Sequence, residues 1–365
     1  MTMPLMPADL NVRQHNFSAG PGALPAEVLE EVRDEMLVYP GLGASIAEVS
    51  HRSAAFVEIF ERARARITSL LGLGSDWTVM FLQGGASMQF YQVPLNFLRA
   101  DASADYLDTG VWAAKAIVEA RRFGGVRVAG TSRETGYDRI PTDLDLDDGA
   151  AYLHFTSNNT IYGTQHATEP RAAVPLVCDA SSDFLSRPID ADRYGLIYAG
   201  AQKNIGLAGV TAVLVRDAFL ATRTPDLPTM LDYGSHSGTM HNTPPVFAVY
   251  VVDKVLGWIE RQGGLGAMQA ANGAKADLLY RTLDASAFYV PVAQRDSRSQ
   301  MNVCFRLPTP ALDARFAAEA EREGLLALKG YRTVGGIRAS LYNAVPLAAV
   351  EALVAFMAGF EADHG

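Results

Sequence analysis

The sequence predicts an α/β protein: a large domain with a mostly parallel sheet wrapped by helices, followed by a smaller α+β C-terminal domain. Short apolar runs alternate with helical patterns along most of the chain, which is typical of parallel strands joined by helices. The 365 residues also exceed what one ordinary hydrophobic core accommodates. A Gly-Gly pair ends a helical pattern at residue 264, so we place the large domain at residues 17–264 and the small domain at 265–365, with residues 1–16 packing nearby.

The first expected elements are two amphipathic helices. Residues 28–36 carry an apolar stripe behind Pro25, which suits a first helical position. Residues 56–70 repeat that spacing after Ser53, and Gly72 is placed to cap the helix at its C-terminus. Strand candidates then follow at residues 79–82, 105–107, 126–129, 152–155, 176–178, 197–199 and 210–215.

The last third of the chain begins with an aperiodic stretch. Residues 222–245 are rich in Pro, Thr, Gly and His, and we interpret them as a long loop with a functional role. Helices are predicted at residues 246–261 and 267–283. The small domain should then contain strands at 301–307 and 336–341 and helices at 312–323 and 347–360.

Composition excludes several classes of protein. No apolar run approaches the roughly 20 residues of a membrane helix, and a net charge of -9 argues against a nucleic-acid surface. Residues 1–16 lack the pattern of a secretory signal, and Cys178 and Cys304 lie in apolar strand-like runs that suit buried reduced thiols. We therefore expect a cytoplasmic protein. We expect no metal site, a solvated loop at residues 143–148, and a satisfied core histidine at His154.

The most informative residue is Lys203, which follows an apolar strand and lies among small residues. Asp179 follows a neighbouring strand, and the carboxyl ends of parallel strands share one edge of the sheet. An amine and a carboxylate placed in this way are what pyridoxal phosphate requires. The lysine holds the aldehyde as an imine, and the carboxylate keeps the pyridine nitrogen protonated so that the ring accepts electrons. Lys203, once displaced, can act as the base that moves the substrate proton.

A phosphate cradle is the next requirement. Residues 79–88 form a strand, a glycine pair and a helix start, and amides at a helix start bind phosphate. The segment lacks the Lys-Ser/Thr ending of a nucleotide-binding loop. Trp112, beyond another strand, could stack on the cofactor ring, and Thr160 could donate a hydrogen bond to the ring oxygen.

Five further segments are informative together. They are 16–22 (NFSAGPG), 48–52 (EVSHR), 198–206 (YAGAQKNIG), 242–245 (NTPP) and 335–343 (GGIRASLYN). In this order they resemble phosphoserine aminotransferases, and the resemblance runs from about residue 16 to the C-terminus. It implies a fold-type-I pyridoxal-phosphate transferase of class V, a homodimer that exchanges an amino group between L-glutamate and 3-phosphohydroxypyruvate.

The resemblance also implies roles for individual residues. Lys203 and Asp179 would be catalytic, and Arg338 would bind the substrate α-carboxylate. Asn242 and Thr243 would reach the cofactor phosphate of the other subunit, so that the active sites are shared. The other implied cofactor contacts are Ala86, Ser87, Trp112, Thr160 and Gln202, and the other implied substrate contacts are Ser18, His51, Arg52 and Arg332.

Two departures from the family pattern concern the substrate phosphate. Tyr331 stands where many members have a histidine, and Ser87 stands where some carry an arginine. We expect phosphate binding to be weaker or rearranged, although a phenol can still donate a hydrogen bond.

Three alternatives stay open. One is a related aminotransferase for serine, alanine or glyoxylate, although two substrate anions call for more than one arginine. A cysteine desulfurase is disfavoured because Cys304 has a buried-strand pattern. The third is a dimer that binds pyridoxal phosphate without turnover, against which the presence of both Lys203 and Asp179 argues.

Overall fold

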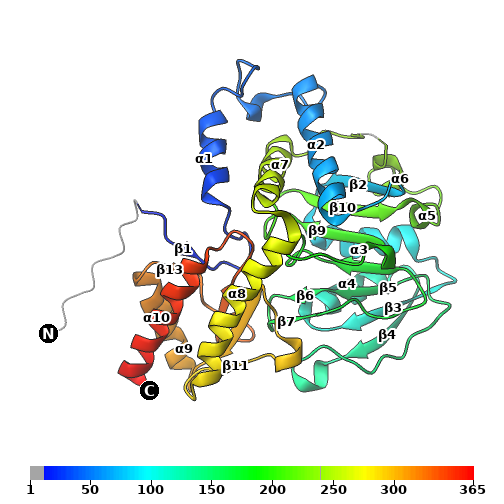
Figure 1. The fold of residues 1–365 in the computed structure, drawn as a ribbon. Coiled ribbons are helices and arrows are strands. Elements are labelled where there is room, and N and C mark those ends of the chain that lie inside the picture. The colour runs from blue at the N-terminus through cyan, green and yellow to red at the C-terminus, as the bar shows by residue number, and fades with distance from the viewer. Residues whose placement is uncertain (1–11, 239) are drawn as a thin grey trace.

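The computed structural model describes residues 12–238 and 240–365, and its centre is a seven-stranded sheet (Figure 1). Neighbouring strands are parallel except for β10, which runs antiparallel to both β2 and β9. The predicted mostly parallel sheet is thus confirmed. In spatial order the strands are β2 (Trp77–Leu82), β10 (Thr211–Arg216), β9 (Tyr194–Gly200), β8 (Leu176–Asp179), β5 (Leu153–Thr156), β3 (Ser103–Asp108) and β4 (Gly125–Thr131).

Helices cover both faces of this sheet (Figure 1). Side chains alternate along a strand, so Val79 and Phe81 of β2 join one core while Met80 and Leu82 join another. Helices α2 (Ala54–Leu71) and α7 (Val246–Arg261) pack in the first core, and α3 (Gly85–Phe97) and α4 (Val111–Ala120) pack in the second. The predicted C-terminal cap of α2 is confirmed, since Gly72 has a φ of 64°, and Ser53 caps the other end by accepting a hydrogen bond from the Phe56 amide.

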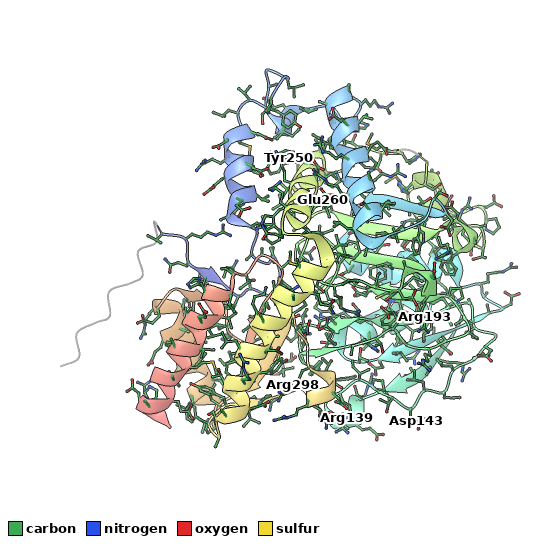
Figure 2. All side chains as sticks on the ribbon, viewed as in Figure 1. Arg139, Asp143, Arg193, Tyr250, Glu260 and Arg298 are labelled. Carbon is green, nitrogen blue, oxygen red and sulfur yellow. The ribbon has the colours of Figure 1, made fainter. Side chains whose placement is uncertain are left out.

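A third core surrounds the sheet β11-β12-β14. Long helix α8 (Gly264–Ala285) connects the cores, because Leu265 and Met268 pack with the large sheet while Leu279 and Leu283 pack with the small one. Arg298, labelled in Figure 2, pairs with Asp284 near the end of this helix. The remaining elements here are β11 (Val290–Pro291), β12 (Asn302–Arg306), α9 (Pro310–Arg322), β13 (Leu325–Leu326), β14 (Ile337–Ser340) and α10 (Leu347–His364).

The N-terminal segment joins the small unit. Strand β1 (His15–Asn16) pairs in parallel with β13. Residues 1–11 lie outside the described residues. Helix α1 (Ala26–Glu35) follows, and its buried side chains are Val28 and Val32. The expected apolar stripe is narrower than its sequence suggested, since Leu29 is exposed.

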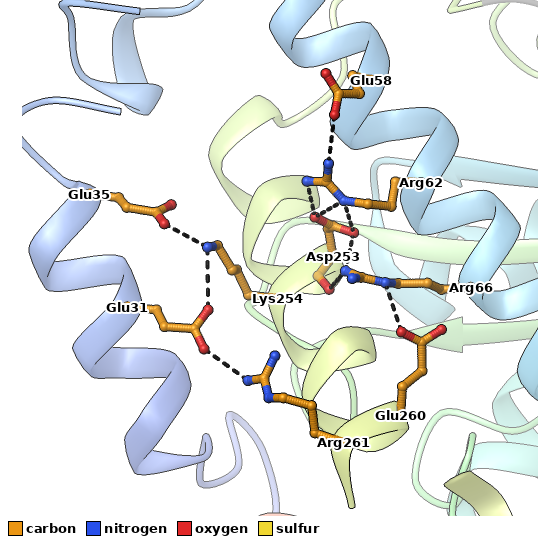
Figure 3. Close-up of polar contacts among 9 residues, drawn as sticks. All are labelled: Glu31, Glu35, Glu58, Arg62, Arg66, Asp253, Lys254, Glu260 and Arg261. Atoms are coloured by element: carbon orange, nitrogen blue, oxygen red, sulfur yellow. Dashed lines mark hydrogen bonds and ion pairs between the residues drawn. The ribbon is translucent and has the colours of Figure 1, made fainter. Parts of the chain in front are cut away.

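Ion pairs between charged side chains connect α1 and α2 to α7 (Figure 3). The buried carboxylate of Asp253 on α7 accepts from Arg62 and Arg66 of α2, each at 2.6 Å. Lys254 pairs with Glu31 and Glu35 of α1 at 3.3 and 2.7 Å. The Lys254 pairs thus connect α1, whose buried side chains are only Val28 and Val32, to α7.

Two sequence expectations need correction. The long loop at 222–245 contains a helical turn, α6 (Tyr233–His236), and a second short helix, α5 (Asp217–Leu220), lies before it. His154 is buried, but only its Nε2 has a partner, the hydroxyl of Tyr198 at 2.9 Å. Its Nδ1 has none among the described residues, and burial lowers the pKa of His154 to about 3. His154 is therefore a core histidine as predicted, but only one of its two ring nitrogens has a hydrogen-bond partner among the described residues.

Candidate active site

A cavity of about 470 Å³ opens at the carboxyl ends of the parallel strands, where open α/β sheets bind ligands. Strand ends and the turns after them supply most of its wall. The small hairpin of β6 (Asn158–Asn159) and β7 (Thr164–Gln165) borders it, and β14 supplies Arg338. The predicted residues that line this single cavity are Ala86, Ser87, Trp112, Thr160, Asp179, Gln202, Lys203 and Arg338.

Lys203 and Asp179 meet in this cavity as predicted. Burial lowers the pKa of the Lys203 amine, and Asp179 opposes that effect while Arg338 adds to it. Burial likewise raises the pKa of Asp179, and Lys203 and Ser181 oppose that shift. Each group is thus costly to ionise alone and is stabilised by the other, an arrangement typical of functional sites.

The Asp179 carboxylate is held through one of its oxygens. The amide N–H and the hydroxyl of Ser181 both donate to Oδ1, at 3.0 and 2.6 Å. In the described part of the chain no other hydrogen bond reaches this carboxylate, which leaves Oδ2 for a ligand in the cavity. A protonated ring nitrogen is a suitable partner for that oxygen.

Trp112 and Thr160 are linked directly. The indole Nε1–H of Trp112 donates to Thr160 Oγ1 at 3.2 Å. Because that bond uses the threonine oxygen as an acceptor, the hydroxyl proton of Thr160 remains available to a ligand. The Lys203 Nζ lies 5.9 Å from the centre of the indole ring. A flat aromatic ring can therefore stack on Trp112 within reach of the Thr160 hydroxyl.

The start of α3, where the phosphate cradle is predicted, lies in the wall of this cavity. Gly84 has a φ of 94°, and a Cβ there would lie 2.5 Å from the Cβ of Met88. Glycine is therefore required for the turn that leads into the helix. Ala86 and Ser87 in the first turn line the cavity, and the amides of a first helical turn have no partner within the helix. These amides can bind an anion.

Arg338 is the arginine that the structure brings into the cavity. Its Nη1 donates to the Thr160 carbonyl oxygen at 3.1 Å, which holds the guanidinium beside Trp112 and Lys203. Tyr331 also lines the cavity, whereas Arg332 is exposed and does not. In this protomer the predicted Arg332 thus lies outside the cavity, and its neighbour Tyr331 lies in the cavity wall.

The other predicted residues lie elsewhere in the protomer. His51 and Arg52 line a separate cavity of about 390 Å³. Asn242 donates to Gln83 Oε1 at 2.9 Å, and the Thr243 carbonyl lies 3.5 Å from Gln83 Nε2. Neither Asn242 nor Thr243 lines the Lys203 cavity. Ser18 is near its edge, two residues before Gly20, which does line it.

Sequence reasoning missed several cavity residues. Thr156, Ser181 and Ser182 line the wall beside Asp179, and Thr156 Oγ1 is buried without a partner among the described residues. The same rule that located Asp179 could have found them, since each lies at or just after the carboxyl end of a strand. A polar atom left unpaired in a cavity wall indicates that a ligand belongs there.

A larger cavity, about 600 Å³, lies between residues 13–16, α8 and residues 343–349. It holds another lysine, the buried Lys275, whose Nζ donates to the Leu341 and Tyr342 carbonyls at 2.8 Å each. Two backbone acceptors already occupy this amine, and no buried carboxylate lines the cavity. It therefore lacks the pair of groups found around Lys203.

The sequence model of class-V aminotransferases matches residues 14–353. The chain belongs to the class-V aminotransferase family. A phosphoserine aminotransferase of Desulfosudis oleivorans is 51% identical over 361 residues, which cover 98% of this chain and 100% of the relative. One of Herpetosiphon aurantiacus is 48% identical over 357 residues, covering 96% and 99%.

Solved structures agree with this assignment. A phosphoserine aminotransferase from Bacillus circulans subsp. alkalophilus superposes with a TM-score of 0.94 at 47% identity, covering 97% of this chain and 99% of that one. A Trichomonas vaginalis phosphoserine aminotransferase, solved with pyridoxal phosphate bound, gives 0.90 at 38% identity, covering 95% and 100%. This class-V aminotransferase is a transaminase that uses pyridoxal phosphate, and the fold predicted from its sequence is confirmed. The cavity residues fit that cofactor: an amine, a free carboxylate oxygen, an available hydroxyl and a helix start.

No helix among residues 12–238 and 240–365 combines the length and apolarity needed to cross a membrane.

Proposed function

We propose that this enzyme is a phosphoserine aminotransferase, which transfers an amino group between L-glutamate and 3-phosphohydroxypyruvate to give O-phospho-L-serine and 2-oxoglutarate. The observation that carries the proposal is the cavity that combines Lys203 and Asp179 with Arg338. Full-length relatives near 50% identity support the choice of substrate. The proposal also includes a phosphorylated hydroxythreonine precursor of vitamin B6 as a second substrate, by resemblance to the family.

Bound pyridoxal phosphate supplies an aldehyde that takes up the amino group and a ring that accepts the electron pair left at the substrate Cα. Asp179 would keep a proton at the ring nitrogen of the cofactor. Lys203 would take the substrate Cα proton and hold it for return to the carbon that was the aldehyde, and the burial that lowers the pKa of its amine favours the neutral, basic form. Thr160 would donate a hydrogen bond to the ring oxygen, and Trp112 would supply a flat surface on which the ring could stack.

The proposal assigns the two substrate anions to different groups. Arg338 binds the carboxylate common to both amino donors, because its planar guanidinium can make paired hydrogen bonds. Tyr331, His51, Arg52 and Arg332 form the proposed phosphate side, with Ser18 close by. Gln202, Ala86 and Ser87 contact the cofactor.

A homodimer with shared active sites is part of the proposal. His51, Arg52, Asn242 and Thr243 lie outside the Lys203 cavity of their own protomer. If these four residues act on cofactor and substrate, they do so in the partner's cavity. Val57 lines the same cavity as His51 and Arg52 and is exposed, as are Leu37 and Val38 between α1 and α2, and contiguous exposed apolar patches mark interaction surfaces.

We also propose the domain division at residue 264 and a cytoplasmic location. The division agrees with the separate core around the small sheet, and the location agrees with two free cysteines.

The test compares O-phospho-L-serine with L-serine as amino donor and 2-oxoglutarate as acceptor. We expect kcat/KM to favour the phosphorylated donor by about 100-fold or more, since each charge-assisted hydrogen bond to the phosphate contributes about 1.5 to 3 kcal/mol. Equal rates with serine, alanine or glyoxylate as substrate would instead support the related aminotransferase.

A further inference from the structure

Ser181 connects the two groups that hold the cofactor. It follows β8 by two residues, it is 5% exposed, and it lines the cavity. Its hydroxyl lies 2.6 Å from Asp179 Oδ1 at the end of β8. The same hydroxyl oxygen lies 3.1 Å from the amide nitrogen of Gly200, the last residue of β9. Lys203 is three residues beyond Gly200.

The number of protons on Gly200 N and Ser181 Oγ determines which atom donates in each of these two hydrogen bonds. The Gly200 N–H can only donate, so the Ser181 oxygen is its acceptor. A serine hydroxyl has one proton, and that proton is then directed to Asp179 Oδ1. The amide N–H of Ser181 donates to the same oxygen at 3.0 Å. The carboxylate is therefore clamped at Oδ1 and is turned so that Oδ2 faces the cavity.

Ser181 also opposes the burial of Asp179. Burial raises the pKa of this carboxyl, whereas Lys203 and the hydroxyl and amide of Ser181 lower it. The buried Cys178 thiol, Asp183 carboxyl and Tyr198 phenol also interact electrostatically with Asp179. None of the three donates a hydrogen bond to its carboxylate, so Ser181 is the described side chain that favours the ionised form by a direct hydrogen bond.

We propose that Ser181 is a positioning residue for the reaction: its hydroxyl holds the Asp179 carboxylate ionised and turned toward the cofactor ring nitrogen, and anchors it to the strand that carries Lys203. The proposal depends on the cofactor alone. It holds whether the amino donor is phosphoserine or serine, so its failure and that of the proposed function can be told apart.

The test measures the affinity of the apoprotein for pyridoxal phosphate as a function of pH. Wild type is compared with Ser181→Ala, Ser181→Thr and Ser186→Ala. Threonine keeps the hydroxyl. Ser186 is the matched control: it is a buried serine whose hydroxyl donates to the Asp183 carbonyl at 2.7 Å, outside the cavity. Melting temperatures establish that each variant is folded.

We expect Ser181→Ala to weaken cofactor binding by about 10- to 100-fold, the effect of losing one hydrogen bond to a charged group. The acid limb of the affinity profile should also move to higher pH, because the carboxyl is then more easily protonated. Ser181→Thr should keep the wild-type limb, and so should Ser186→Ala. A Ser181→Ala profile that keeps the wild-type limb, or a Ser181→Thr limb that moves equally, would overturn the proposal.

Discussion

Replacing Asp179 by asparagine removes the charge from the cofactor site while keeping the side chain's shape. The carboxylate is 5% exposed, and a ring N–H bound to Oδ2 would lie about 3 Å from it. With an effective dielectric constant of about 20, two unit charges at that distance attract by about 5.5 kcal/mol. Relaxation of the site offsets part of this energy, so we expect the amino-transfer rate to fall by about 10² to 10⁴.

The assay is a single-turnover reaction of cofactor-loaded protein with glutamate, followed by the absorbance of the bound cofactor. Loading is verified before mixing, so that a slow rate reflects chemistry and not lost cofactor. The wild-type protein and Ser186→Ala provide the reference rates. A loaded Asp179→Asn protein that reacts within about tenfold of wild type would refute the role of Asp179, because the ring would then not need its charge.

Three further predictions concern other residues. Tyr331→Phe should raise KM for phosphoserine about fivefold, the effect of one lost hydrogen bond of about 1 kcal/mol, without changing KM for glutamate in steady-state assays; an equal rise for both donors would contradict this. Asp253→Ala should lower the free energy of unfolding by about 2 to 3 kcal/mol, because Arg62 and Arg66 lose a buried partner but are themselves partly exposed; an unchanged urea midpoint would argue against it. Burial lowers the pKa of Lys275 to about 7, so the unfolded chain binds more protons between pH 7 and the ordinary lysine pKa near 10.4. Relative to Lys275→Met, the wild type should therefore gain stability as pH rises through that window, and a pH-independent difference in denaturation midpoints would contradict it.

Much of the fold could be predicted from sequence because its signals are local. Ser53 and Gly72 mark the ends of α2 by their own hydrogen bonds and backbone angles. Alternation of strands and helices likewise predicts a parallel sheet. The reversed direction of β10 has no such signal, because a strand buried on both faces reads the same in either direction.

Some residues of the candidate site could likewise be predicted from the sequence, and others could not. Lys203 and Asp179 could be placed together because each follows an apolar run, and the carboxyl ends of parallel strands converge. The same rule also places Ser181 in the cavity wall, but its hydrogen bonds to residues 179 and 200 cannot be predicted from any spacing in the sequence. Arg332 has no such signal: the glycine-rich turn around it leaves its side chain exposed on this protomer and Tyr331 in the cavity wall, and its role in binding phosphate stays a prediction.

Borohydride reduction tests the central assignment most directly. Reduction of the cofactor-loaded protein fixes the cofactor covalently to the amine that holds it, and peptide mass mapping then identifies the lysine. We predict that the label lies on Lys203 and that Lys203→Ala, still folded, is unlabelled. A label on Lys275, or an undiminished label in Lys203→Ala, would contradict the account.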